Sequence, residues 1–170
     1  MVIHGWALAN AGQTEEGVEE IRRGLAEYIA TGAGLWWPDF LALHAEADLR
    51  AGQAAAGLGL VADALDRVAR GGRRWIEPEL HRLRGELLLT LPQADTSEAL
   101  ACFRHAIAIA RGHGARMLEL RAATTLARLW RDQGRRTEAR DLLGPIYGWF
   151  TEGFATPDLR DARALLDELG

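Results

Sequence analysis

Residues 52–70 read Gly52-Gln-Ala-Ala-Ala-Gly-Leu-Gly-Leu-Val-Ala-Asp-Ala-Leu-Asp-Arg-Val-Ala-Arg70, and this stretch decides the fold. Gly52 is a turn residue, Gly57 is a small residue early in a helical segment, and Val61 is a large apolar residue four positions later. Apolar side chains spaced by three and four positions predict an amphipathic helix with one buried face. Here that face carries Leu58, Val61, Leu65 and Val68.

The same pattern recurs about every forty residues, a period that predicts stacked helical hairpins, a solenoid. The small residue and the large apolar residue occur together at Gly17 and Ile21, Gly57 and Val61, Ala99 and Phe103, and Ala139 and Leu143. A turn glycine precedes three of these pairs, at Gly12, Gly52 and Gly134. A second break follows the first three pairs, at Gly32, Gly72 and Gly114.

We therefore expect one all-α domain over residues 1–170, a right-handed α-α superhelix of about four hairpins closed by a capping helix. The expected hairpins span about 1–31, 35–71, 75–112 and 116–152, and the capping helix spans 157–169. Thr156, Pro157 and Asp158 form a strong helix start there. The first hairpin has no such cap, so we expect a longer parent protein of which this chain is the C-terminal part. In isolation, this uncapped N-terminal hairpin is expected to allow a homodimer.

Composition excludes several kinds of chemistry. All 20 basic residues are arginine, so a Schiff-base lysine and a phosphate-loop lysine are both absent. Cys102 is the only cysteine, Ser97 is the only serine, and no two histidines share an i,i+4 spacing. We predict no catalytic residue, no metal site and no cofactor, and hence no enzyme within this chain. The absence of a charged leader and of a long apolar run predicts a cytoplasmic protein without a membrane partner.

Four segments carry a resemblance to a known family. They are Glu79-Leu-His-Arg-Leu-Arg-Gly-Glu-Leu-Leu-Leu89, Ala99-Leu-Ala-Cys-Phe-Arg-His-Ala-Ile-Ala-Ile-Ala-Arg111, Leu118-Glu-Leu-Arg-Ala-Ala-Thr-Thr-Leu-Ala-Arg-Leu-Trp130 and Tyr147-Gly-Trp-Phe-Thr-Glu-Gly-Phe154. They resemble the tetratricopeptide-like C-terminal region of bacterial multidomain signalling proteins, predicted ATPases fused to class III adenylate or guanylate cyclase domains. The repeat here is longer than the usual tetratricopeptide period of about 34 residues. The resemblance covers nearly the whole chain.

In that family the cyclase and nucleotide-binding modules lie upstream, so the resemblance implies a regulatory or scaffolding part and carries over no catalytic residue. Tetratricopeptide solenoids also line their concave wall with the first helix of each hairpin. On these helices, the candidate partner-binding residues that lie off the apolar stripes are Glu46, Arg50, Arg82, Glu86, Arg121, Arg128 and Arg131. Arg121 and Arg128 are the best anchors, because they lie one heptad apart on one helix face.

The charge is uneven along the chain, which has a formal net charge of −4. Residues 1–66 hold 3 arginines and 10 acids, whereas residues 67–140 hold 15 arginines and 8 acids. An arginine-lined groove suits carboxylates or phosphates, which guanidinium groups bind with two parallel hydrogen bonds. The same pattern is also typical of a solvated arginine face that binds nothing.

The leading interpretation is a non-catalytic protein–protein interaction module in a larger signalling protein of the cyclase, ATPase or transcription-regulator type. Its partner is expected to be a protein or peptide, preferentially acidic, or a neighbouring domain of the parent chain. One alternative is nucleic-acid or nucleotide binding by the central arginines, which the lack of interleaved exposed aromatic residues disfavours. Another is a small-molecule sensor near Trp36 or Trp75, although tryptophans at repeat junctions more often pack between hairpins.

Overall fold

The computed structural model describes residues 1–71, 74–94 and 96–170, and every regular element in these ranges is a helix. The prediction of an all-α fold is confirmed for this part of the chain. Gly72, one of the predicted breaks, lies outside the described residues. The helices are α1 (Val2–Asn10), α2 (Thr14–Ala30), α3 (Trp37–Arg50), α4 (Ala54–Ala69), the 3-10 turn η1 (Arg74–Ile76), α5 (Glu77–Leu89), α6 (Thr96–Gly112), α7 (Arg116–Asp132), α8 (Arg136–Tyr147) and α9 (Pro157–Leu169).

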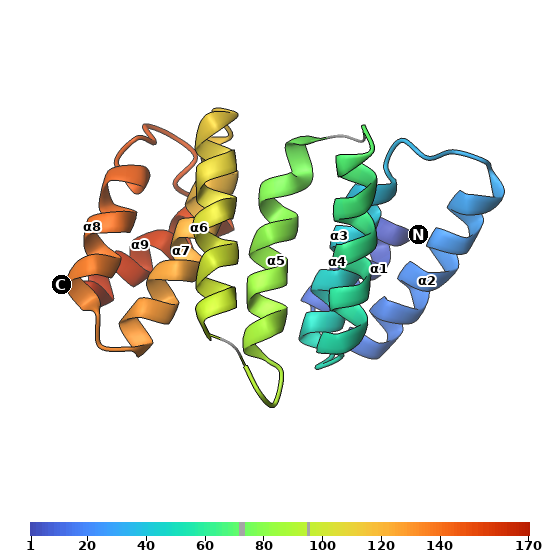
Figure 1. Cartoon of the computed structure of the whole chain (residues 1–170), viewed down its shortest axis with the longest axis horizontal. Helices are drawn as coiled ribbons and strands as arrows, with labels where there is room; N and C mark the ends of the chain where they lie inside the picture. Colours follow the sequence, from blue (N-terminus) through green and yellow to red (C-terminus); the bar gives the residue numbers. More distant parts are fainter. Residues whose placement is uncertain (72–73, 95) are drawn as a thin grey trace.

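The helices pack in consecutive pairs, and the pairs follow one another along the molecule. Helices α1 and α2, α3 and α4, α5 and α6, and α7 and α8 contact each other most extensively. Each odd-numbered helix also contacts the next odd-numbered helix, from α1 through α3, α5 and α7 to α9. Figure 1 shows the resulting elongated row, with the N-terminal pair at one end and α8 and α9 at the other. The odd-numbered helices thus form one continuous series.

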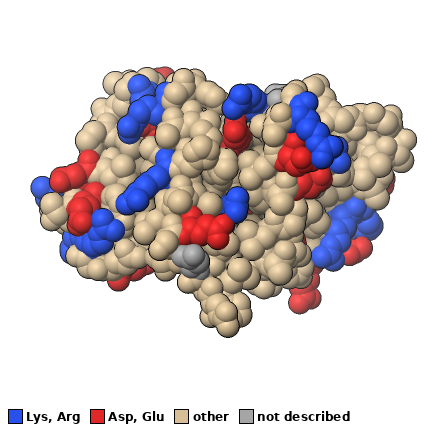
Figure 2. All heavy atoms as spheres, viewed as in Figure 1, with Lys and Arg blue, Asp and Glu red and all other residues tan. Residues whose placement is uncertain are grey.

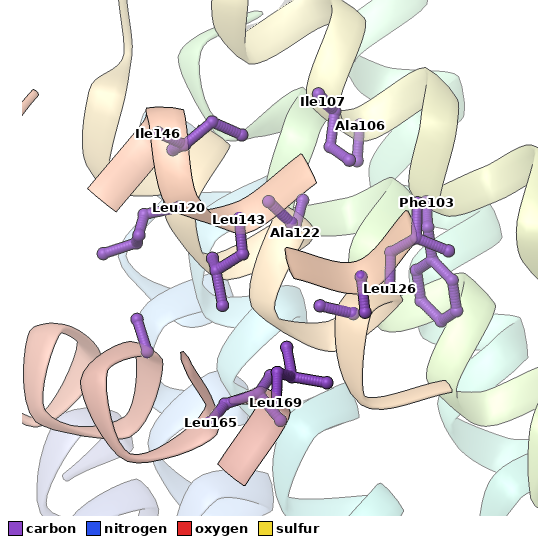
Figure 3. Packing of buried hydrophobic residues seen from close by; sticks show 14 of the residues in the cluster. Phe103, Ala106, Ile107, Leu120, Ala122, Leu126, Leu143, Ile146, Leu165 and Leu169 are labelled. Carbon is purple, nitrogen blue, oxygen red and sulfur yellow. The ribbon is translucent and has the colours of Figure 1, made fainter. Parts of the chain in front are cut away.

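The repeated residues of the sequence lie in the core. Ile21, Val61, Phe103 and Leu143 are at most 1% exposed, which confirms that the large apolar position of each repeat is buried. Three apolar clusters follow one another, the first mainly between α1 and α2, the second among α3, α4 and α5, and the third among α6 to α9. Figure 3 shows part of the third cluster, in which buried side chains of α6, α7, α8 and α9 come together.

The turn glycines end helices in the same way at equivalent places. Gly52 (φ 69°) and Gly134 (φ 78°) have left-handed backbone conformations, which glycine adopts without steric cost. The next residue then donates its N–H back to the helix, from Gln53 to the carbonyl of Asp48 and from Arg135 to that of Trp130, both at 2.8 Å. This closure turns the chain back sharply between the two helices of a pair.

Two features differ from the sequence-based expectation. Helix α8 ends at Tyr147, short of the expected hairpin end near residue 152, because Pro145 lacks the backbone N–H donor that a continuing helix needs. Trp75, predicted to fill the gap between hairpins, is 47% exposed.

Among the described residues, no helix is both long and apolar enough to cross a membrane.

Candidate functional site

A groove of about 460 Å³ runs across four consecutive odd-numbered helices. Its lining is almost entirely polar, with Leu49 as the one purely hydrocarbon side chain among the described residues that form it. The lining residues are Glu46, Leu49 and Arg50 of α3, Arg82 and Glu86 of α5, Arg121, Thr124, Thr125 and Arg128 of α7, and Asp158 and Asp161 of α9. Six of the seven residues predicted from the sequence line this groove, and Arg131 does not.

Arg82 forms the buried centre of the groove. Its Nη2 donates to Oε1 of Glu79 at 2.7 Å, and its Nη1 donates to Oε2 of Glu86 at 2.6 Å. The Nε donates to the second oxygen of Glu79 at 3.1 Å, so all three guanidinium nitrogens are hydrogen-bonded. These contacts arise because residues three and four positions apart lie on one helix face. Arg82 is therefore held rigidly and belongs to the wall of the groove.

Glu79 is the buried counterpart of this arginine. Burial alone raises the pKa of a carboxyl group, but the charge and hydrogen bonds of Arg82 and the charge of Arg121 outweigh it. The pKa of Glu79 is consequently below its ordinary value of 4.5. The charges of Glu79 and Glu86 in turn raise the pKa of Arg82 despite its burial, so both partners stay charged.

Helix α9 lines the far side of the groove with carboxylates that pair with the arginines of α7. Nε of Arg121 lies 3.0 Å from Oδ1 of Asp158, and Nη2 of Arg128 lies 3.0 Å from Oδ2 of Asp161. Beyond the groove, Arg131 donates to Glu168 at 2.6 Å. The arginines sit at intervals of 7 and 3 residues, and the acids at intervals of 3 and 7. These intervals run in opposite order along the two helices, so spacing in the sequence does not predict which acid pairs with which arginine.

Other polar contacts connect the remaining odd-numbered helices. The indole Nε1 of Trp6 on α1 donates to Oε2 of Glu46 on α3 at 2.7 Å. The other oxygen of Glu46 accepts from Arg50 at 3.0 Å. Between α5 and α7, the hydroxyl of Thr125 donates to Oε1 of Glu86 at 3.3 Å. Polar contacts thus join two further pairs of neighbouring odd-numbered helices, α1 with α3 and α5 with α7.

The charge of the groove is balanced, which differs from the arginine-rich wall that the sequence predicts. Four arginines line it together with four carboxylates, and the carboxylates on α9 are the ones that sequence reasoning missed. Figure 2 shows a similar balance on the face drawn there, where blue and red groups lie side by side in small separate patches. The described residues include no group of three or more histidine, cysteine or acidic side chains arranged to hold a metal ion.

Comparison of the chain with protein-family models, with curated proteins and with solved structures gave no match. The resemblance to cyclase-associated signalling proteins therefore stays a prediction.

Proposed function

We propose that this chain is a non-catalytic protein-interaction module whose groove binds a segment of another protein. The observation that carries the proposal is that α3, α5, α7 and α9 all contribute side chains to one groove. A tetratricopeptide-like solenoid is the architecture we infer from the serial contacts of the odd-numbered helices. In such an arrangement the packed helices hold polar side chains at fixed positions, which favours recognition of an extended ligand.

The lining favours a protein segment over a small molecule. The volume of about 460 Å³ lies within the range of small-molecule sites, but such sites are mostly lined by apolar and aromatic residues. Trp36 and Trp75, which the small-molecule alternative invokes, are not among the residues that line the groove. Charged and hydroxyl side chains instead match the backbone groups and polar side chains of a peptide.

The same lining disfavours nucleic acid. Phosphate binding requires cations whose charge is available to the backbone of the ligand. The four positive charges of the groove are offset by four negative ones, so the groove presents no net positive charge to a run of consecutive phosphates. We further propose, from the resemblance described above, that the module regulates or scaffolds a larger cytoplasmic signalling protein.

A displayed library of random twelve-residue peptides, selected on the immobilised chain, tests the proposal. Thr125→Trp places a large side chain in the groove, and Thr137→Trp, on the exposed surface of α8, is the matched control. We expect the enriched peptides to lose at least tenfold in affinity for the Thr125→Trp variant and to bind the control normally. Melting temperature and helicity establish that both variants fold. Failure to enrich any peptide, or equal binding to both folded variants, would contradict the proposal.

A further inference from the structure

The charged groups of the groove differ in how much of their hydrogen-bonding capacity is already used. Arg82 bonds carboxylates through all three nitrogens and is 9% exposed. Both oxygens of Glu86 accept hydrogen bonds, and so do both oxygens of Glu46. These three residues are occupied by their neighbours and offer little to a ligand.

Two cations of the groove retain spare donors and contact a single carboxylate each, whereas Arg121 contacts two. Among the described residues, Arg50 donates from Nη2 to Glu46 alone, and Arg128 donates from Nη2 to Asp161 alone. A guanidinium group carries five N–H donors, so most of those on each side chain remain available. Their side chains are equally exposed, at 43%. Arg50 on α3 and Arg128 on α7 are therefore the places where the groove accommodates a carboxylate.

The spare acceptors lie on α9. Asp161 accepts from Arg128 through Oδ2, and Asp158 accepts from Arg121 through Oδ1. For each carboxylate, the second oxygen makes no hydrogen bond to the rest of the described chain. The side chain of Asp161 is 61% exposed, so this oxygen is open to a cation. The groove thus offers donors at α3 and α7 and acceptors at α9.

We infer that the groove recognises an extended segment whose charge is dipolar, with acidic side chains over α3 and α7 and a basic side chain over α9. This inference rests on the proposed function and names the chemistry of the partner. A uniformly acidic segment, which the sequence favours, would place a carboxylate against Asp161. Neighbouring packed helices are about 8–10 Å apart, and an extended chain rises about 3.3 Å per residue. Three such spacings, from α3 to α9, correspond to about eight residues.

Fluorescein-labelled ten-residue peptides test this inference by fluorescence anisotropy. The dipolar peptide carries two glutamates in its first six positions and two arginines at its end, with serine and alanine elsewhere, and a second version has the reversed order. The comparison peptides carry four glutamates or four arginines in the same background. We expect one of the dipolar peptides to bind at least tenfold more tightly than either uniformly charged peptide.

Substitutions at the two ends of the groove test which residues produce the preference for the dipolar peptide. Arg50→Ala with Arg128→Ala is expected to weaken the dipolar peptide at least tenfold. The control, Arg70→Ala with Arg163→Ala, removes two exposed arginines that do not line the groove and that each pair with an acid, and it should leave binding unchanged. Asp161→Arg is expected to switch the preference to the acidic peptide, an effect that a purely structural role of Asp161 would not produce.

The outcomes separate the two proposals. If the acidic peptide binds the unmodified chain as tightly as the dipolar peptides, or if Asp161→Arg leaves the preference unchanged, the dipolar inference is wrong while the binding groove stands. If library peptides bind the Thr125→Trp variant normally, the proposed function fails, and the dipolar inference fails with it.

Discussion

Arg121 of α7 lies 3.0 Å from the carboxylate of Asp158 of α9, across 37 residues of sequence. The same guanidinium group lies 3.6 Å from Glu79, a buried residue of α5. One arginine therefore joins three consecutive odd-numbered helices. Because of this position, we expect Arg121 to stabilise the wall of the groove, whereas Arg128 is the more available of the two predicted anchors.

Arg121→Ala is expected to lower the free energy of unfolding by about 1–2 kcal/mol, because buried Glu79 loses one of its two compensating charges. Arg128→Ala serves as the comparison and should cost about 0.5 kcal/mol or less, since its pair with Asp161 is exposed. Urea denaturation followed by circular dichroism measures both values. Equal costs for the two substitutions would show that Arg121 does not have this structural role.

Arg82→Met is expected to be far more disruptive, at about 3–5 kcal/mol, because it leaves buried Glu79 without its main partner. Adding Glu79→Gln removes the uncompensated charge and should restore part of the lost stability. Arg84→Met on the same helix is the control, since Arg84 pairs with Glu98 at the surface and its loss should matter little. The same denaturation experiment applies, and a cost for Arg82→Met no greater than that of the control would refute the prediction.

His44 and Asp48 of α3 are expected to change the stability of the fold in opposite directions as the pH falls. Their nearest atoms, Nε2 and Oδ1, are 3.6 Å apart, and both side chains are buried. Burial, aided by the charge of Arg22, lowers the pKa of His44 to about 4. Burial raises the pKa of Asp48 to about 6, although the charge of Arg22 opposes this shift.

Unfolded His44 binds its proton near pH 6.5, before the folded form does, so lowering the pH from 6.5 to 4 favours unfolding. Folded Asp48 binds its proton near pH 6, before the unfolded form does at 3.8, so the same change favours folding. Asp48→Asn should therefore leave the response of His44 unopposed, and stability should fall by about 1 kcal/mol or more between pH 6.5 and 4.5.

His44→Leu should have the opposite effect and make stability rise as the pH falls from 6 to 4. Melting temperatures measured from pH 4 to pH 7 compare the two variants with the unmodified chain. Parallel pH profiles for all three proteins would contradict the opposed titration of this pair.

Gly85 of α5 packs directly against the ring of Phe103 on α6. A Cβ atom built on Gly85 would lie 2.4 Å from Cε1 of Phe103, a side chain that is fully buried. Gly85→Ala is therefore expected to destabilise the chain by about 1–3 kcal/mol through overpacking. Combining it with Phe103→Leu should cost less than the sum of the two separate substitutions, because the smaller side chain relieves the clash.

Gly59→Ala is the matched control for this prediction. Gly59 lies within α4, and no atom lies within 4 Å of a Cβ built there. The substitution should stabilise the chain by about 0.5–1 kcal/mol, since alanine loses less backbone entropy in a helix. Thermal denaturation of the two variants should shift in opposite directions, and a stabilising Gly85→Ala would disprove the close approach.

The sequence was most informative about the fold. The forty-residue recurrence identified Ile21, Val61, Phe103 and Leu143 as core residues, because burial of one face imposes a spacing that sequence displays directly. The predicted capping helix appears as α9 with its start at Pro157. Trp75 was misjudged because apolar character does not reveal whether a residue in a connecting turn faces inward.

The sequence was less informative about the groove. It identified the polar residues on the first helix of each pair, but it did not reveal which acids compensate them. Asp158 and Asp161 follow Arg121 and Arg128 by more than thirty residues, and local spacing carries no direct information about contacts at that separation. The sequence also did not reveal that Arg82 is buried with all three guanidinium nitrogens hydrogen-bonded. This depends on how α5 packs between its neighbours, which only the three-dimensional structure shows.

Amide chemical-shift mapping of the isotopically labelled chain with the dipolar peptide tests the central claim most directly. The account predicts that the perturbed amides lie along the odd-numbered helices, with the largest changes near Arg50, Arg128 and Asp161. Perturbations confined to α2, α4, α6 and α8, or absent from the groove at saturating peptide, would contradict it.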